Sequence, residues 1–227
     1  LGTAFFAGVK AAEPDMQESA DIFFDDSKLM DIRVLSTLGL TEDDVTAISA
    51  IEGVESAIPV YTYDVLTEKD EKQHVVKTEG RMPQESGECL ADWLLEQNYG
   101  YKIGDKITIS SGDDKAIEDI VNTQTYTITG FGKSSYYLDL TRDSSTIGNG
   151  SMSGFLIIPE DNFTLEAFTE IDVLVDGAIA LDCYSDAYED AVDEVTQKIK
   201  DIAGDRCEIR YAEVVREAQD AIAEAET

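Results

Sequence analysis

The pattern of apolar and polar positions divides the first third of the chain into a β-α-β unit. It predicts a strand at 31–37, a helix at 41–53 and further strands at 54–66 and 73–78. Thr41, followed by three acidic residues, is a typical helix N-cap, and Gly53 follows the last apolar position of the helical repeat. Pro59 indicates an edge strand or a bulge, because proline cannot donate to a sheet ladder.

The last third of the chain repeats this order. Residues 170–176 predict a strand, residues 186–203 predict an amphipathic helix that ends at Gly204, and residues 207–211 predict a closing strand. Two β-α-β units at opposite ends of one chain can share a sheet that has helices on one face. We therefore predict an α+β fold in which both chain ends form a split β-α-β subdomain.

The middle of the chain predicts a smaller, mostly β inserted subdomain. It has a short helix at 89–97, strands at 106–110, 125–129 and 154–158, and glycine-rich turns. The stretch 130–153 has no regular element, and loops of that length are usually functional or disordered. The predicted division is a membrane-proximal helix at 1–20, the α/β subdomain at 21–78 and 160–211, the insert at 79–159 and a C-terminal stalk helix at 212–227.

Both ends of the chain have the pattern of longer helices. The first nine residues, LGTAFFAGV, read as the last turns of a hydrophobic helix; a buried first strand or an arbitrary boundary is the alternative. Residues 211–227 form an amphipathic repeat with no stop signal. The two ends suggest a loop domain of a larger membrane protein. Its terminal helices, near 4–16 and 214–225, are then expected to lie side by side and to carry motion from the bilayer.

The charge of the chain excludes several classes of protein. There are 48 acidic and 17 basic residues, giving a net charge of −31. Such a surface repels phosphate backbones and anionic headgroups, so we expect neither nucleic-acid binding nor docking on a membrane surface. His74 is the single histidine and lies in a predicted strand, where a structural or solvent-facing role is expected. We predict no cofactor and no metal site.

The three cysteines have no C-x-x-C spacing and are interpreted as buried apolar side chains. They are Cys89, Cys183 and Cys207. The chain has no G-x-x-x-x-G-K-[ST] phosphate loop, so any ATPase activity must belong to another polypeptide. No local motif nominates a catalytic residue, and we do not expect an enzyme.

Acidic clusters leave two alternative functions open. The clusters are Asp25-Asp26, Asp113-Asp114 and Asp182 with Asp186. One alternative is a calcium-responsive surface module, although no cluster has the spaced D-x-D-x-D-G ligand ladder. The other is a secreted acidic hydrolase with paired carboxylates, which should show a pocket with two convergent acids and a raised pKa. Solvated acidic faces are the simpler interpretation.

The strongest binding candidates lie in the 130–153 stretch. They are Phe131, Tyr136, Tyr137, Arg142 and Asn149. Tyrosine and arginine combine a large contact area with directional hydrogen bonds, which is typical of recognition hot spots. These residues predict a site for a substrate or for an extracellular protein or peptide partner. The alternative is that the tyrosines pack this loop onto the insert.

Three segments, in order, resemble a known class of domain. They are EGRMP at 79–83 with GECL at 87–90, YGYKIGDKI at 99–107, and TITG at 127–130. The likeness is to the MacB-like periplasmic core domain, the extracytoplasmic domain of ABC transporter permeases of the MacB/FtsX-like class.

This resemblance implies both a fold and a role. The fold is a porter-like α/β subdomain built from both chain ends, with a smaller β-rich insert. The domain would lie on the extracellular face of the cell membrane, between the first two transmembrane helices of a permease half. Its role would be to couple ATP-driven motion of membrane helices to a substrate or an extracellular partner, without catalysis. The implied partners are the transmembrane helices of the same permease and a separate ATPase subunit.

Overall fold

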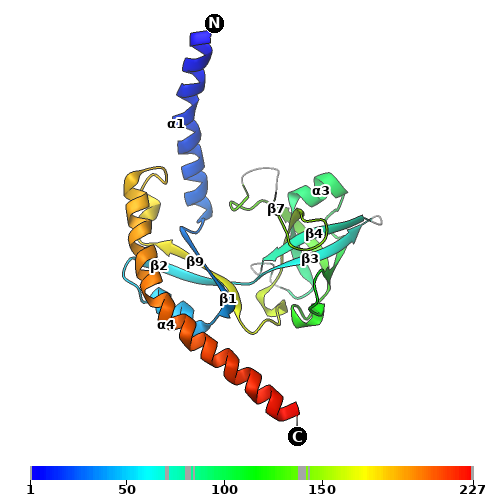
Figure 1. Cartoon of the computed structure of the whole chain (residues 1–227). Coiled ribbons are helices and arrows are strands. Elements are labelled where there is room, and N and C mark those ends of the chain that lie inside the picture. The colour runs from blue at the N-terminus through cyan, green and yellow to red at the C-terminus, as the bar shows by residue number, and fades with distance from the viewer. Residues whose placement is uncertain are drawn as a thin grey trace. The chain divides into compact units, whose positions relative to one another are not determined.

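The chain has a mixed α+β fold with two compact units (Figure 1). The computed structural model describes residues 2–69, 72–79, 83, 85–137, 142 and 144–225. The first unit comprises Leu1–Ile58 and Ile171–Thr227, and the second comprises Pro59–Glu170. The insert predicted at 79–159 lies within the second unit.

The first unit is built on a three-stranded sheet of order β1-β9-β2. Its elements are α1 (Gly2–Ser27), β1 (Ile32–Leu40), α2 (Glu42–Ser49), β2 (Val54–Val60), β9 (Phe168–Val175), the 3-10 turn η3 (Ala178–Ala180) and α4 (Asp186–Ala225). The Asp31 N–H donates to the Val173 carbonyl at 3.0 Å, and the Asp176 N–H donates to the Gly53 carbonyl at 2.8 Å. The β-α-β order predicted for the first third is confirmed.

Helices α2 and α4 pack onto this sheet. Alternate residues of β9 are buried, together with Ile48 of α2 and Val195 of α4. A Cβ atom added to Gly53 would lie 2.9 Å from Val195 Cγ2, so α4 approaches the turn before β2 closely. Thr41 is the N-cap of α2 as predicted, and Asp44 accepts from the Thr41 N–H at 2.8 Å, which is the reciprocal bond of a capping box.

Helix α4 runs through Gly204 without a break. The closing strand predicted at 207–211 is therefore wrong, and with it the second β-α-β unit. Arg206 Nε pairs with Asp44 Oδ1 at 2.7 Å, and Arg210 Nε donates to the Leu38 carbonyl at 3.2 Å. These contacts fix the segment as a helix across α2 and β1. A glycine inside a helix costs only about 1 kcal/mol, so the glycine does not stop it.

The terminal helices do not lie side by side. The end of α1 meets the segment that leads into α4, where the Cys183 N–H donates to Asp21 Oδ1 at 2.8 Å. From this contact the two helices run in different directions, and Figure 1 shows the chain ends far apart. The predicted side-by-side arrangement is wrong because α4 continues past the sheet instead of ending at Gly204. Among the residues that the structure describes, no helix is both long enough and apolar enough to cross a bilayer.

The second unit is a closed barrel of order β3-β4-β8-β5-β7-β6. Its elements are β3 (Thr62–Lys69), β4 (Lys72–Glu79), β5 (Glu88–Asp92), α3 (Trp93–Tyr99), β6 (Lys106–Ser111), η1 (Ile117–Asp119), β7 (Thr125–Gly132), β8 (Met152–Ile157) and η2 (Glu160–Asn162). Strand β3 pairs antiparallel with both β4 and β6, which closes the barrel. Strand β4 pairs parallel with β8, and β5 pairs parallel with β7. Fully buried side chains fill the interior, among them Leu95, Tyr126, Ile128 and Leu156.

Two predicted elements of this region differ in the structure. The single strand predicted at 54–66 is two strands, β2 and β3, separated at Tyr61. The helix predicted at 89–97 begins only at Trp93, because Cys89 and Ala91 are buried positions of strand β5. Asp92 makes the change from strand to helix, since its Oδ1 accepts from the Leu94 N–H at 3.1 Å. The side chain of His74, in β4, lies outside the described part of the structure.

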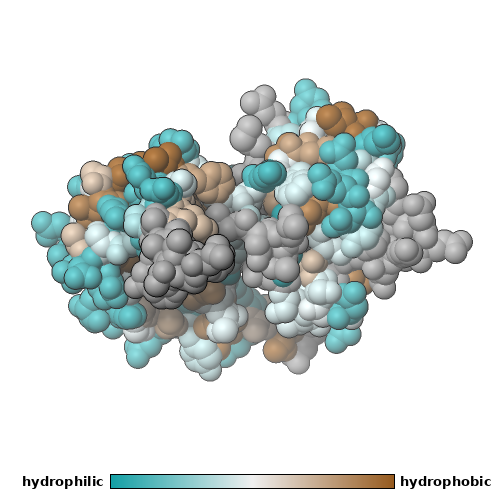
Figure 2. Space-filling model, turned by 90° about the horizontal axis from the view of Figure 1, so that it is seen from above, coloured by the Kyte–Doolittle hydropathy of each residue, from teal (hydrophilic) through white to brown (hydrophobic). Residues whose placement is uncertain are grey.

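Exposed apolar side chains are found mainly on the first unit. In the described part of the chain they include Met16, Ile22, Leu35, Ile179 and Tyr184. Figure 2 shows apolar patches interspersed with hydrophilic ones on the face seen from above. The cysteines differ in burial: Cys89 is buried, Cys183 is half-buried and Cys207 is exposed. The prediction of three buried thiols is therefore confirmed for Cys89 alone and is wrong for Cys207.

Candidate functional site

Arg142, a predicted binding residue, is a buried ion-pair partner in the barrel unit. Its Nε lies 2.7 Å from Asp92 Oδ2, and its Nη2 lies 3.0 Å from Asp92 Oδ1. The two side chains are 2% and 0% exposed. The guanidinium therefore neutralises a buried carboxylate, and in this conformation it does not reach the surface.

Two predicted tyrosines pack around this ion pair. The guanidinium carbon of Arg142 lies 4.8 Å from the ring centroid of Tyr137. The ring of Tyr137 in turn stacks on the ring of Phe155, with centroids 5.9 Å apart. The ring of Tyr136 packs edge-on against the ring of Tyr137, with centroids 4.9 Å apart. This layered arrangement joins the long loop to strand β8 of the barrel. It matches the alternative in which the tyrosines pack the loop.

The other two predicted residues lie apart from this stack. Phe131 is on β7 and packs against the barrel core. Asn149 is exposed in a turn, where its Oδ1 accepts from the N–H and from the Oγ of Ser151, each at 3.1 Å. The structure thus brings Tyr136, Tyr137 and Arg142 together. Partner binding at this loop stays a prediction.

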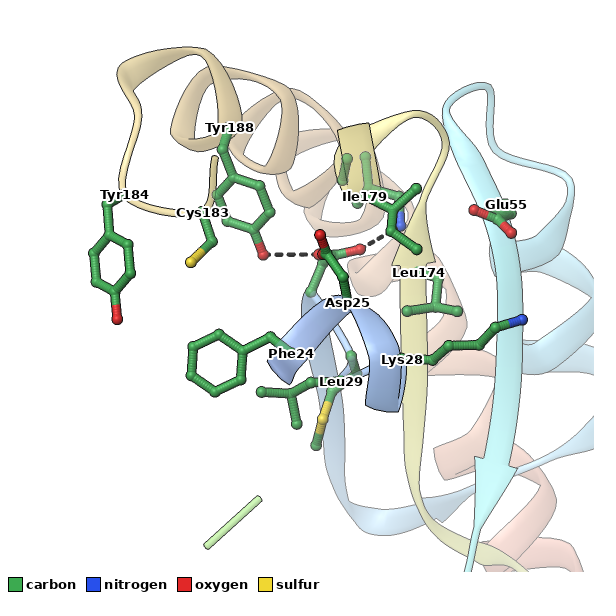
Figure 3. A pocket seen from close by; sticks show the side chains of 14 residues that line it. Phe24, Asp25, Lys28, Leu29, Glu55, Leu174, Ile179, Cys183, Tyr184 and Tyr188 are labelled. Carbon is green, nitrogen blue, oxygen red and sulfur yellow. Dashed lines mark hydrogen bonds between the residues drawn. The ribbon is translucent and has the colours of Figure 1, made fainter. Parts of the chain in front are cut away.

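A cavity of about 340 Å³ lies in the first unit, at the end of α1. Figure 3 shows side chains from the last turn of α1 facing the segment that leads from η3 into α4. Its apolar lining includes Phe24, Leu29, Leu174 and Ile179, and Tyr184 lies at its edge. Its charged lining residues are Asp25, Lys28, Asp31 and Glu55.

Asp31 is a structural anchor at this cavity. Its Oδ2 accepts from the Val175 N–H and its Oδ1 from the Tyr188 hydroxyl, each at 2.7 Å. The dashed line from Tyr188 in Figure 3 marks the second of these bonds. Burial and the bond to Asp31 raise the pKa of Tyr188, so this hydroxyl stays protonated and remains a donor. The contact ties the first turn of α4 to the start of β1.

Asp25 is one of the three acids of the cavity. Its pKa lies above its usual value because of partial burial and because of repulsion from Asp21, Asp26 and Asp31. Lys28, at the end of α1, adopts a left-handed backbone with φ of 49°. Within the described residues, it is the single cation of the lining, against three carboxylates.

One acidic cluster of the sequence meets a further acid in the folded chain. Asp182 and Cys183 lie close to Asp21, with possible ligand atoms all within 4.8 Å of one another. Calcium takes six to eight oxygen ligands, and this group offers two carboxylates and a thiol. Burial, followed by the hydrogen bond with Asp21, raises the pKa of Cys183 to about 12, so the thiol stays protonated. In the cluster Asp113-Asp114, the carboxylate of Asp113 accepts hydrogen bonds from the hydroxyls of Tyr63 and Ser111 and from the Lys115 N–H.

The cavity also bears on the hydrolase alternative, which requires two convergent acids and a raised pKa. Asp25 has the raised pKa, and Asp31 also lines the cavity. Both oxygens of Asp31, however, accept hydrogen bonds from within the fold. These bonds give Asp31 a structural role, and Glu55 is the remaining carboxylate of the lining.

The residues that organise the ion pair of the barrel and the cavity of the first unit were not predicted from the sequence. Asp92 could have been found from its position before Trp93-Leu94-Leu95, since aspartate before an apolar run is a typical N-cap. Asp31 and Tyr188 give no such signal, because they are 157 residues apart and meet only in the folded chain.

Comparison with known proteins gives structural likeness at low identity. No protein-family model and no curated protein matches the sequence. The extracellular domain of the noncanonic ABC-type transporter YknZ from Gram-positive bacteria is 10% identical, with a TM-score of 0.39; the match covers 74% of this chain and 87% of that one. The periplasmic region of MacB from Actinobacillus actinomycetemcomitans is 12% identical, with a TM-score of 0.38; that match covers 73% and 75% of the two chains.

Proposed function

We infer that this chain is a non-catalytic extracytoplasmic domain of an ABC transporter permease, on the extracellular face of the cell membrane. The observation that carries the inference is the meeting of three segments that resemble this class. The Thr127 N–H donates to the Gly87 carbonyl at 2.8 Å, and the Gly104 N–H donates to the Ile128 carbonyl at 2.8 Å. Segments 87–90, 99–107 and 127–130 are therefore neighbours on one side of the barrel.

The glycines of these segments have a structural reason to be there. Gly87, Gly100 and Gly104 have φ values of 81°, 70° and 93°, a region that other residues rarely adopt. Gly100 ends α3, and Gly104 turns the chain into β6. The pattern is thus a requirement of the barrel and names no catalytic group. The remaining residues of the resemblance, 80–82, lie outside the described part of the chain.

The proposed mechanism is mechanical coupling to membrane helices of the same permease. A separate ATPase subunit would supply the motion, and a substrate or an extracellular protein or peptide would receive it. Within the first unit, a pull on α1 would reach α4 through the bond between Asp21 and the Cys183 N–H. Helix α4 has 40 residues, so it is a rod of about 60 Å.

The exposed thiol of Cys207 allows a test of location. In intact cells that produce the full-length protein, a maleimide that cannot cross membranes should label the wild type more than Cys207→Ser. Cys89, which is 0% exposed, should contribute no labelling. Labelling of Cys207 that appears only after the cells are lysed would overturn the proposed location.

A further inference from the structure

The cavity at the end of α1 has the size of a small-ligand site, and the proposed function does not use it. Small-molecule sites commonly occupy about 300–1,000 Å³ and are largely apolar with a few polar groups. This cavity measures about 340 Å³. That volume equals about eleven water molecules at roughly 30 Å³ each, so it fits a ligand of that many non-hydrogen atoms.

The lining has two chemically distinct parts. Phe24, Leu29, Leu174 and Ile179 offer apolar surface, and Ile179 is 53% exposed. The charged part holds three carboxylates and the ammonium of Lys28. Asp25 belongs to this part and is crowded by Asp21, Asp26 and Asp31.

The crowding of Asp25 indicates the charge of a complementary ligand. An anionic group would add to the repulsion already present among these acids. A cation beside Asp25 would replace repulsion by a charge-assisted hydrogen bond in a partly desolvated site. The rings of Phe24 and Tyr184 are also suited to a cation, because an aromatic face attracts positive charge.

We propose that this cavity binds a small amphipathic cation, a ligand with an apolar body and one ammonium or guanidinium group. The apolar body packs against Phe24, Leu29 and Ile179, and the cation lies beside Asp25. The proposal is independent of the transporter role, since it concerns only residues of the first unit and needs no membrane.

Three probes with the same apolar body test the charge requirement on the 227-residue chain. They are phenylbutylamine, phenylbutanol and phenylbutyrate, titrated by calorimetry at one fixed salt concentration. The amine should bind saturably, the alcohol about tenfold more weakly, and the acid should show no binding. In the protein's NMR spectrum the amine should shift the amide signals of Cys183 and Tyr184. No saturable binding of the amine, or equal binding of all three probes, would overturn the proposal.

Two substitutions with matched controls test the position. Asp25→Asn should weaken amine binding about tenfold and leave alcohol binding unchanged, whereas Asp205→Asn, on an exposed part of α4, removes the same charge and should change neither. Ile179→Lys places a second ammonium, in addition to that of Lys28, at the cavity and should abolish amine binding; Ile103→Lys, on the second unit, should not. Equal losses in Asp25→Asn and Asp205→Asn would mean attraction to the acidic protein as a whole, and would refute the site.

Discussion

Arg142 and Asp92 form a bidentate ion pair inside the barrel unit, although they are 50 residues apart in the sequence. The pair joins the long loop before β8 to the residue that caps α3. The side chain of Arg142 is thus engaged within the fold, while partner binding at the loop stays a prediction.

Removing the arginine should destabilise the protein strongly. Arg142→Met leaves Asp92 buried without its counter-charge, which typically costs about 3–5 kcal/mol. The free energy of unfolding from urea titration measures this loss. Glu194→Ala breaks the ion pair of the exposed Glu194 with Lys198 and should change the free energy of unfolding little. If the two variants lose the same stability, the Arg142 pair is not buried in solution.

Two tyrosine hydroxyls should respond in opposite ways to removal. Tyr126 is fully buried, and among the described residues its hydroxyl has no hydrogen-bond partner. Tyr126→Phe should leave the free energy of unfolding unchanged or raise it by up to about 1 kcal/mol. Tyr188→Phe removes the donor to Asp31 and should lower it by about 1–3 kcal/mol. A larger loss in Tyr126→Phe than in Tyr188→Phe would contradict this assignment of hydrogen bonds.

The pairing of Asp44 with Arg206 should make stability depend on pH. Burial alone would raise the pKa of Asp44, but bonds from the Thr41 N–H and from Arg206 outweigh it, and the pKa lies below its usual value. A lowered pKa contributes stability above the unfolded value of about 3.9, and this contribution is lost as the pH falls below it.

The stability difference between the wild type and Asp44→Asn should therefore be large at pH 7 and shrink below about pH 4. Urea titrations at pH 7, 5 and 3 measure it. Asp205→Asn, in an exposed position, serves as the control. A difference that grows on acidification would show that the sign of the shift is wrong.

A substitution at Gly204 tests whether α4 continues through this residue or ends there. Its added Cβ would meet open space, and its backbone is helical. Gly204→Ala should raise the free energy of unfolding by about 0.5–1 kcal/mol, because alanine is the better helix former. Gly100→Ala should lower it, since Gly100 has the same open space but a φ of 70°. Destabilisation by Gly204→Ala would indicate a helix end at this position.

Salt should stabilise a chain with a net charge of −31. The Debye length falls from about 30 Å at 0.01 M to about 3 Å at 1 M, which screens repulsion among the 48 acidic residues. The midpoint of thermal unfolding should therefore rise across this range of sodium chloride. Calcium chloride at equal ionic strength should give the same midpoint. A higher midpoint in calcium would favour the calcium-responsive alternative.

The sequence predicted the elements that are determined by neighbouring residues. Thr41 and the three acidic residues after it predicted the start of α2, and the alternation of apolar and polar residues predicted β1 and β9. The prediction of a strand at 207–211 was wrong because the conformation of this segment depends on contacts with residues distant in the sequence. Arg206 contacts Asp44, 162 residues away, and Arg210 contacts Leu38, 172 residues away. Packing against the sheet outweighs a weak local preference for strand.

The candidate sites show the same limit. Composition identified Tyr136, Tyr137 and Arg142 as a group, and the structure does bring them together. Their orientation depends on Asp92 and Phe155, which no spacing rule connects to them. The cavity of the first unit gave no sequence signal, because its lining comes from α1, the sheet and the segment before α4.

Two hydrogen bonds anchor α4 to β1 and fix the number of residues that lie between them in α4. Tyr188 donates to Asp31, just before β1, and Arg210 donates to the carbonyl of Leu38, near the end of β1. One inserted or deleted residue would rotate everything after it by about 100° around the helix axis and carry Arg210 away from its acceptor. The span 188–210 should therefore tolerate no change of length in evolution or in engineering.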